Sequence, residues 1–206
     1  GDETYPFIKD IDEREPAGMC YTSATTGKPK GVVYTHRAIA LHSYALALAD
    51  SAAISESDVA MAVVPQFHVN AWGMPFACTW FGSTQVMPGP RFTPERLARF
   101  IQEFGVTITA GVPTIWLGLL REIEENDYDL SSLRGILCGG SAAPIGMIRT
   151  FEQKYNIPFF HAYGATETTP LVTYSRLKSY QADLSPAEKV DEKARQGILI
   201  PGLEMK

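Results

Sequence analysis

Short apolar runs alternate with amphipathic segments along most of the chain. A short apolar run bounded by turn-forming residues is typical of a buried strand. The regular spacing of these runs predicts βαβ units, and therefore an α/β fold with a largely parallel sheet and flanking helices. The predicted strands are Gly18–Tyr21, Val32–Tyr34, Val59–Val64, Thr84–Met87, Thr107–Ala110, Gly135–Cys138 and Pro158–His161.

The clearest helix signal lies between Thr93 and Gly105. Thr93 is a good N-cap residue, Pro94 suits the first turn, and the charge of Glu95 interacts favourably with the helix dipole. The apolar side chains that follow lie on one helix face, and Gly105 ends the pattern. Further helices are expected after Thr35, near Pro113 and at Pro144.

One strongly polar stretch, Ser175–Gln196, predicts a solvated loop or helix face, and we assign it no chemistry. The chain begins without Met and closes on Gly202–Lys206, which we interpret as a strand that enters further sheet. Both ends are therefore expected to be cuts in a longer protein.

The composition is that of a globular protein. With 206 residues, of which 45% are hydrophobic, the chain can form one large domain or two small ones. Lys and Arg number 18 against 23 Asp and Glu, and the resulting net charge of -5 offers no broad basic surface for nucleic acid. No apolar run approaches the roughly 20 residues of a membrane span, so we expect no integral membrane segment.

The three cysteines, Cys20, Cys78 and Cys138, lie far apart and form no CxxC pair. This spacing argues against a zinc ribbon, a redox motif or a disulfide framework. We expect buried thiols in a reducing, cytoplasmic environment, in a protein that could also lie peripherally at a membrane.

The most informative stretch is Tyr21–Gly31, which places hydroxyl residues, glycines and two lysines between two predicted strands. Hydroxyls and backbone N–H groups can converge on phosphate oxygens, glycine permits a close backbone approach, and lysine neutralises polyphosphate charge. The Walker A pattern does not match, because Lys28 is followed by Pro29 instead of Ser or Thr. The alternative interpretation is an ordinary polar surface turn.

This loop resembles the phosphate loop of the acyl-adenylate-forming superfamily, which includes acyl-CoA synthetases, luciferases and peptide-synthetase adenylation domains. The family pattern is Tyr-Thr-Ser-Gly-Thr-Thr-Gly-x-Pro-Lys-Gly, and Ala24 departs from it where glycine is usual. A positive φ would be mildly strained at Ala24, but the rest of the loop matches. The resemblance implies phosphate contacts from Thr22, Ser23, Thr25, Thr26, Gly27 and Lys30.

A second stretch that resembles the family is Phe67–Trp72. Alone, His68 and Trp72 would more often be core residues, because a single aromatic side chain carries little functional information. The resemblance implies that His68 approaches the acyl carboxylate and the α-phosphate, while Val69 and Trp72 border the acyl site. The Val-Asn-Ala-Trp continuation is most similar to medium- and long-chain fatty-acid enzymes.

The third stretch is Gly139–Pro144, whose small residues leave room for a planar base and an acyl chain against the backbone. By resemblance, Gly140 and Ser141 contact the nucleotide, and Gly140 also the acyl substrate. Gly-x-Ser-x-Gly of a serine hydrolase is the alternative, although Ala143 replaces its last glycine. A Ser175-x-x-Lys178 pair also occurs, without any companion motif.

The fourth stretch, His161–Glu167, matches the family pattern Tyr-Gly-x-Thr-Glu after a predicted strand. A carboxylate suits Mg²⁺ that bridges phosphates, and an aromatic face stacks on a base without base specificity. Alternatively, Glu167 is an exposed charge at a helix start. The resemblance implies that the His161 and Ala162 backbone and the Tyr163 ring hold adenine, that Thr166 meets the α-phosphate, and that Glu167 and Thr22 hold Mg²⁺.

Taken together, the resemblance spans Tyr21–Lys206 and implies the layered N-terminal domain of adenylate-forming enzymes, with residues 1–206 as its central ATP/AMP-binding segment. The closing segment, which begins at Gly197, is similar to the family pattern Gly-x-Pro-x-Pro-Gly, but Leu199 replaces the first proline. The expected activity of the full enzyme is ATP- and Mg²⁺-dependent conversion of a medium- or long-chain fatty acid and CoA to acyl-CoA, with Thr166, Glu167, His68 and Lys30 catalytic.

Family elements that lie beyond Lys206 are a ribose-binding aspartate and a C-terminal lid domain with a catalytic lysine, so we expect the segment alone to be inactive. Adenylating enzymes with another acceptor, of luciferase or carrier-protein type, and a silent nucleotide-binding module remain alternatives. The full enzyme could also form a homo-oligomer.

Overall fold

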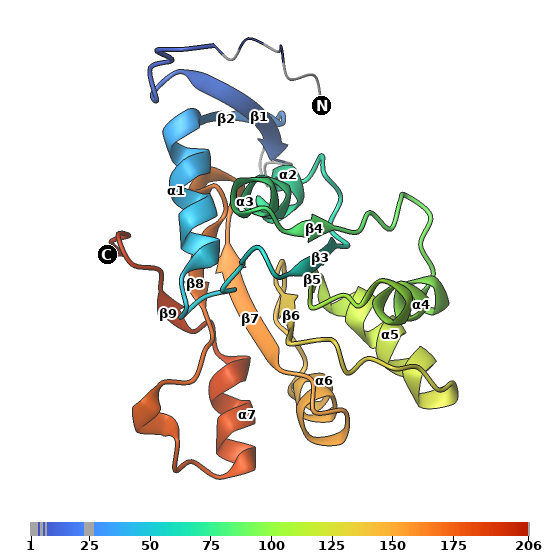
Figure 1. Cartoon of the computed structure of the whole chain (residues 1–206). Coiled ribbons are helices and arrows are strands. Elements are labelled where there is room, and N and C mark those ends of the chain that lie inside the picture. The colour runs from blue at the N-terminus through green and yellow to red at the C-terminus, as the bar shows by residue number, and fades with distance from the viewer. Residues whose placement is uncertain (1–3, 5, 7, 23–26, 206) are drawn as a thin grey trace.

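A twisted sheet forms the centre of the computed structural model, which describes residues 4, 6, 8–22 and 27–205 (Figure 1). In these ranges the main sheet has seven strands in the order β4-β3-β5-β6-β7-β8-β9. The strands β4, β3, β5, β6 and β7 run parallel, whereas β8 and β9 are antiparallel. Their bounds are β3 Val59–Ala62, β4 Thr84–Gln85, β5 Ile108–Gly111, β6 Gly135–Cys138, β7 Phe159–Gly164, β8 Leu171–Tyr174 and β9 Ile198–Leu199. The predicted α/β fold with a largely parallel sheet is confirmed.

Helices pack on both faces of the sheet and form two separate apolar cores. One core joins the sheet to α4 (Pro94–Phe104), α5 (Pro113–Glu125), α6 (Ile145–Arg149) and α7 (Pro186–Ala194). The other joins it to α1 (His36–Ala47) and α3 (Met74–Phe81). Short helical turns lie at Val69–Trp72 (α2), Thr150–Lys154, Thr166–Thr168 and Ser179–Gln181.

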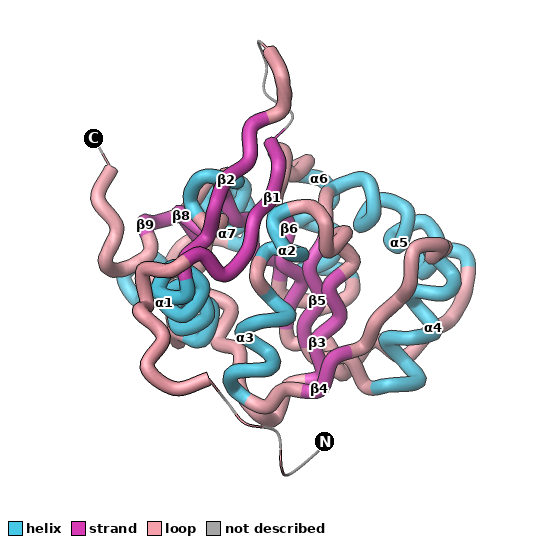
Figure 2. The backbone as a smooth tube through the Cα atoms, turned by 90° about the horizontal axis from the view of Figure 1, so that it is seen from above, coloured by secondary structure: helices cyan, strands magenta, loops and turns pink. Residues whose placement is uncertain are grey.

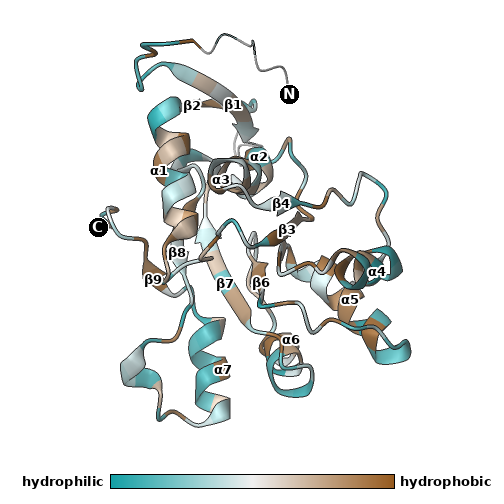
Figure 3. Ribbon diagram, in the orientation of Figure 1, coloured by the Kyte–Doolittle hydropathy of each residue, from teal (hydrophilic) through white to brown (hydrophobic). Residues whose placement is uncertain are grey.

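The alternation of side-chain direction along the strands explains why helices cover both faces of the sheet. Successive side chains of a strand point to opposite faces, so a strand buried on both faces is apolar throughout. Phe159 belongs to one core and Phe160 to the other, and Ile136 and Leu137 are divided in the same way. Figure 3 shows the hydrophobic colour of β6 and β7 in the centre and the hydrophilic outer turns of α7.

The local helix signals are found where the sequence predicts them. Thr93 caps α4 by accepting a hydrogen bond of 3.2 Å from the backbone N–H of Arg96, and Gly105 ends that helix with a φ of 60°. Thr35 caps α1 in the same way, with a distance of 3.1 Å from the backbone nitrogen of Ala38. The predicted helix near Pro113 is also confirmed.

The first two predicted strands do not belong to the parallel sheet, and this part of the prediction is wrong. β1 (Pro16–Thr22) and β2 (Lys30–Thr35) pair with each other in an antiparallel hairpin. Residues 23–29 are too few for a crossover to a parallel neighbour, so a hairpin is the only pairing that they allow. Figure 1 shows this hairpin above the main sheet, and in Figure 2, seen from above, it passes in front of the sheet.

The polar stretch Ser175–Gln196 is less solvated than expected. It contains α7, whose residue Val190 is buried in the core, and Lys193 forms an ion pair with Glu152. The two charged side chains are 13% and 15% exposed, so this pair is mostly removed from water. At the end of the chain, the strand predicted at Gly202–Lys206 is not found among the described residues 202–205, which form a turn and irregular backbone. The last strand, β9, ends before that segment, at Leu199.

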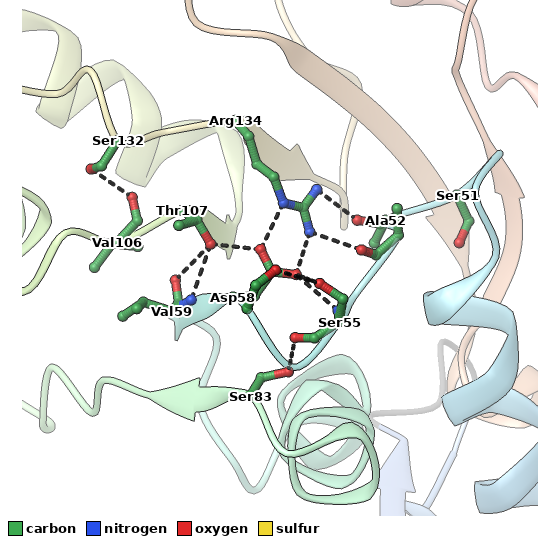
Figure 4. Close-up of polar contacts among 12 residues, drawn as sticks. Ser51, Ala52, Ser55, Asp58, Val59, Ser83, Val106, Thr107, Ser132 and Arg134 are labelled. Atoms are coloured by element: carbon green, nitrogen blue, oxygen red, sulfur yellow. Dashed lines mark hydrogen bonds and ion pairs between the residues drawn. The ribbon is translucent and has the colours of Figure 1, made fainter.

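A buried carboxylate ties the amino ends of the strands together (Figure 4). Asp58, only 3% exposed, accepts hydrogen bonds from Nε and Nη2 of Arg134 at 2.7 and 2.8 Å. The Thr107 hydroxyl donates to the same carboxylate at 2.7 Å. Since these residues directly precede β3, β5 and β6, the network fixes that edge of the sheet and leaves the carboxyl ends of the strands for other contacts.

Candidate active site

A pocket of about 240 Å³ opens at the carboxyl ends of β6 and β7, the edge where open α/β sheets generally bind ligands. It brings together three stretches that are far apart in the sequence: the turn after β3, the glycines after β6, and the segment between β7 and β8. The lining residues are His42, Leu46, His68, Val69, Trp72, Leu137, Gly139, Gly140, Ala162, Tyr163, Gly164, Ala165, Thr166, Pro170 and Leu171.

The turn after β3 has an unusual backbone. Residues Val69 to Trp72 all have positive φ, with values of 49°, 51°, 50° and 57°, and Gly73 follows with 70°. This left-handed turn costs about 1–2 kcal/mol for each residue with a β-carbon. Such strain persists only where the surroundings enforce it, and it gathers at binding sites. Val69–Trp72 contains no glycine, the residue that usually indicates positive φ, so the sequence pattern could not predict this turn.

Two contacts hold the left-handed turn in place. The thiol of Cys20 donates to Oδ1 of Asn70 at 3.3 Å, and Val69 is buried in a small cluster with Cys20 and Tyr34. The turn therefore packs against the β1–β2 hairpin. It directs His68, which is exposed, and Trp72, which is half-buried, to the same pocket.

The two glycines after β6 make room for Trp72. A β-carbon at Gly139 would lie 3.2 Å from Cη2 of Trp72 and 3.0 Å from the carbonyl oxygen of Ala162. One at Gly140 would lie 3.8 Å from Cζ2 of Trp72, and Gly140 has a φ of 80° that favours glycine in any case. The small residues noted in the sequence thus accept an indole ring as one wall of the pocket.

The end of β7 and the turn after it form a further part of the pocket lining. Ala162 is buried, the ring of Tyr163 is half-exposed at the pocket, and Thr166 begins a 3₁₀ turn. Glu167 is exposed beside this pocket and is not part of its wall. Trp72 and Tyr163 thus both line the pocket together with backbone at Gly139 and Gly140, and aromatic side chains with accessible backbone are features of a base or acyl site.

His161 and Ser141 lie behind the pocket and not in its lining. The His161 ring is 1% exposed, and its Nδ1 and Nε2 face the carbonyl oxygens of Ala194 and Ser141 at 3.2 and 3.3 Å. Since Nε2 faces the Ser141 carbonyl and not its hydroxyl, these residues do not form a nucleophile–base pair. His161 braces the glycine turn against α7 instead.

The Ser175-x-x-Lys178 pair is accounted for by structural contacts. The hydroxyl of Ser175 accepts a hydrogen bond of 2.8 Å from the backbone N–H of His161, and Lys178 forms an ion pair of 2.6 Å with Asp50. All three cysteines are buried and free, as expected. Burial raises the pKa of Cys78 to about 11 and that of Cys138 to about 12, so these two thiols stay protonated.

The phosphate-loop residues lie on the β1–β2 hairpin. Thr22 ends β1 opposite Lys30, which begins β2, so the sequence places a hydroxyl and a cation side by side at the base of the loop. Gly27 and Lys30 are exposed and Thr22 is half-buried, and none of the three contributes to the lining of the pocket. Ser23, Ala24, Thr25 and Thr26 lie outside the described residues.

His42 is a pocket residue that the sequence analysis missed. Its side chain is 7% exposed, and its Nε2 has no hydrogen-bond partner among the described residues. Burial lowers its pKa to about 4, so the ring is neutral at physiological pH. One signal was available: His42 stands four residues before Leu46 on the apolar face of α1, and both line the pocket.

The described residues contain no group of three or more His, Cys, Asp or Glu side chains that could hold a metal ion. The carboxylate of Glu167 is exposed beside the Thr166 turn. Magnesium is commonly held by one or two carboxylates together with substrate phosphates. A single exposed carboxylate beside the Thr166 turn fits that mode of binding better than a cage made by protein alone.

Comparison with known families shows which family the chain belongs to. Residues 3–206 match the sequence profile described as AMP-binding enzyme. The chain belongs to the AMP-binding enzyme family. The glycine-rich pocket, the phosphate-loop hairpin and the Thr166 turn are therefore parts of an AMP-binding enzyme.

Individual relatives agree with this family. The long-chain-fatty-acid–CoA ligase of Thermus thermophilus is 48% identical over 201 residues, which make up 98% of this chain and 37% of the ligase. The medium-chain-fatty-acid–CoA ligase of Ectopseudomonas oleovorans is 42% identical over 206 residues, 100% of this chain and 38% of the ligase. The chain thus spans little more than a third of the length of these relatives.

A solved structure gives the same picture. The o-succinylbenzoate coenzyme A synthetase of Bacillus subtilis, in complex with ATP and a magnesium ion, is similar with a TM-score of 0.71 and 31% identity, over 84% of this chain and 34% of the synthetase. A separate question is whether the chain could cross a membrane. None of the helices described here combines the length and the hydropathy that crossing a lipid bilayer requires.

Proposed function

We propose that this chain is the central ATP/AMP-binding segment of an AMP-forming fatty-acid–CoA ligase, which we call the parent enzyme. The observation that carries the proposal is the pocket itself. It joins Trp72 and His68 to the glycine pair and the Thr166 turn, so that an acyl group and a nucleotide could meet in one place. The relatives that are 48% and 42% identical are fatty-acid–CoA ligases, which supports a fatty acid as the substrate.

The proposed reaction has two steps. A fatty carboxylate first attacks the α-phosphate of ATP, which gives acyl-adenylate and pyrophosphate. The thiol of CoA then attacks the acyl carbonyl and displaces AMP. Neither step needs a covalent bond to the protein, in keeping with the protonated thiols of Cys78 and Cys138 and the structural role of Ser175.

We assign the residue roles from the family resemblance, and the lining of the pocket supports several of them. Val69, Trp72 and Gly140 border the acyl group, and Tyr163 stacks on adenine beside the Ala162 backbone. His68 and Thr166, which both line the pocket, orient the carboxylate and the α-phosphate. His161 and Ser141 act from behind, where they fix the glycine turn.

The phosphate loop supplies the remaining contacts. We assign the β- and γ-phosphates to Thr22, to Gly27, to Lys30 and to the loop residues Ser23, Thr25 and Thr26. Charge builds up on the departing pyrophosphate, and donors and cations fixed in place stabilise it without reorganisation. Glu167, with Thr22, would hold Mg²⁺, which neutralises phosphate charge when it is bound.

Pyrophosphate release by the parent enzyme tests the proposal. The enzyme is given ATP, Mg²⁺ and carboxylic acids of graded length, with and without CoA. We expect release with medium- or long-chain acids and acyl-CoA only when CoA is present. Release with luciferin and light emission, or transfer to a carrier protein, would assign another acceptor. ATP binding without release for any acid would make the chain part of a silent nucleotide-binding protein.

The acyl role of Trp72 has a matched control. Trp72→Ala should raise the KM for the fatty acid and leave the KM for ATP nearly unchanged. Trp80, which is 55% exposed on α3 and is no part of the pocket, provides the control variant Trp80→Ala. Equal effects of the two substitutions on the fatty-acid KM would remove Trp72 from the acyl site.

A further inference from the structure

Tyr34 makes a contact that none of the sequence motifs predicts. Its side chain is 2% exposed near the end of β2, and its hydroxyl donates a hydrogen bond of 2.7 Å to the backbone carbonyl of Thr166. The two residues are 132 positions apart in the chain. This bond directly connects the hairpin that bears the phosphate loop to the turn that presents Thr166 and Glu167.

The surroundings keep the Tyr34 hydroxyl in the form of a donor. Burial raises its pKa above the usual range, and the nearby Cys20 thiol and Glu167 carboxylate act in the same direction. A protonated hydroxyl donates to a carbonyl oxygen, whereas a phenolate could not.

The same buried cluster also contacts the left-handed turn Val69–Trp72. Tyr34 packs with Cys20 and Val69, and Cys20 donates to Asn70 in the left-handed turn before Trp72. The cluster therefore joins the hairpin to two parts of the pocket lining. A shift of the hairpin would move Thr166 through Tyr34 and would move the left-handed turn through Cys20.

We propose that Tyr34 is a positioning residue whose hydroxyl sets the Thr166 turn in register with the phosphate loop during adenylate formation. This inference rests on the proposed function. Thr166 must meet the α-phosphate while the loop holds the β- and γ-phosphates, and small displacements of positioned groups are costly to the rate. Tyr34 acts through the Thr166 backbone and does not itself touch the nucleotide.

The experiment compares two substitutions with the same chemistry in the parent enzyme. Tyr34→Phe removes the hydroxyl that bonds Thr166. Tyr155→Phe removes a hydroxyl that donates to the backbone carbonyl of Ile123 at 3.2 Å, on elements remote from the pocket. Each variant loses one hydrogen bond from tyrosine to backbone, so both should lower the Tm by a similar amount, roughly 2–4 °C.

Only Tyr34→Phe should lower the rate of adenylation. We expect kcat for pyrophosphate release to fall about tenfold with the KM for fatty acid unchanged, whereas Tyr155→Phe should stay within about twofold of the wild type. Combining Tyr34→Phe with Thr166→Ala gives a second readout. If Tyr34 acts through Thr166, the substitution at Tyr34 should add little once the threonine hydroxyl is gone. The proposal would be overturned if the effects of the two substitutions on kcat multiplied in the double variant, or if kcat were unchanged in Tyr34→Phe.

The inference and the proposed function can fail separately. If the wild-type parent enzyme releases no pyrophosphate with any acid, the proposed function fails. The positioning role of Tyr34 is then tested by the dissociation constant for Mg²⁺·ATP, measured by calorimetry. Binding about tenfold weaker in Tyr34→Phe than in Tyr155→Phe would support the positioning role. Equal affinities in the two variants would overturn it.

Discussion

The indole ring of Trp72 rests against Gly139, so closely that a β-carbon there would lie 3.2 Å from the ring atom Cη2. Trp72 reaches this position because four residues of its turn are left-handed, and Gly139 because it follows the last residue of β6. Two segments with different local structure thus share one wall of the pocket, and neither can change without the other.

Gly139→Ala should impair the use of fatty acid by the parent enzyme. The added methyl group would also lie 3.0 Å from the Ala162 carbonyl oxygen, which belongs to the sheet, so the Trp72 ring is the part that must move. We expect kcat/KM for the fatty acid to fall about tenfold, the effect of displacing one contact worth about 1.4 kcal/mol. Gly146→Ala is the matched control, because its β-carbon would meet nothing within 4 Å. Wild-type kcat/KM in Gly139→Ala would contradict this account of the wall.

Glu167→Ala should lower the rate of adenylation by the parent enzyme about 10²-fold or more, through the loss of a ligand for Mg²⁺. The carboxylate is exposed and directly follows Thr166, which lines the pocket and accepts the hydrogen bond from Tyr34. Pyrophosphate exchange is measured over a range of Mg²⁺ concentrations. Glu103→Ala, an exposed glutamate on α4, serves as the control. Exchange like that of the wild type at limiting Mg²⁺ would exclude Glu167 from the metal site.

The main elements of the fold were predictable because their signals are local. Thr93, Pro94 and Gly105 mark α4 by their own backbone preferences, and the apolar run Gly135–Cys138 coincides with β6. The hairpin could not be separated from the parallel sheet by the pattern of its strands alone. Only the short connection between Thr22 and Lys30 argues for antiparallel pairing.

The pocket was predictable only where motifs supplied the residues. His68, Trp72, Gly140 and Thr166 all line it, as the family resemblance implies. Tyr34 and His42 were missed because their roles depend on contacts with distant segments. A buried tyrosine in a strand and a histidine on the inner face of a helix look like ordinary core residues until the fold shows what they face.

Asp58→Asn should destabilise the chain by at least about 2 kcal/mol. The loss should stay below the roughly 3–5 kcal/mol typical of a fully buried ion pair, because the Arg134 side chain is 35% exposed. Burial alone would raise the pKa of Asp58, but hydrogen bonds from Arg134, Thr107 and Ser55 outweigh burial and hold the pKa below its usual value of 3.8. The stabilisation is therefore complete well above pH 3.8 and is lost as the pH falls through the folded pKa.

Urea unfolding of wild type and Asp58→Asn checks both parts of that prediction. The difference in unfolding free energy should be largest near neutral pH and should narrow as the pH falls below 3.8 toward the folded pKa, where the wild-type carboxylate takes up a proton. Asp191→Asn, at an exposed position on α7, should change stability little at either pH. A difference that does not depend on pH would mean that the charge of Asp58 contributes nothing.

His42→Leu should make the stability of the chain less sensitive to mild acid. In the unfolded chain the histidine takes up a proton near pH 6.5, whereas burial lowers its folded pKa to about 4. Between these values the unfolded state binds the additional proton, so the wild type loses stability as the pH falls, by about 1.4 kcal/mol per pH unit. This contribution is fully present above pH 6.5 and is absent in a leucine variant.

The unfolding free energies of the wild type and of His42→Leu, measured from about pH 8 to pH 5, should therefore converge or cross, so that the variant gains stability relative to the wild type as the pH falls. Relative to the wild type, His42→Leu should gain about 2 kcal/mol over that range, since it has no group to protonate there. Ser43→Ala removes a buried hydroxyl from the neighbouring position of α1 without removing a titrating group, so it should shift the wild-type profile and keep its shape. Parallel pH profiles for the wild type and His42→Leu would show that His42 takes up its proton as readily in the folded protein as in the unfolded chain, in spite of its burial beside Gly73.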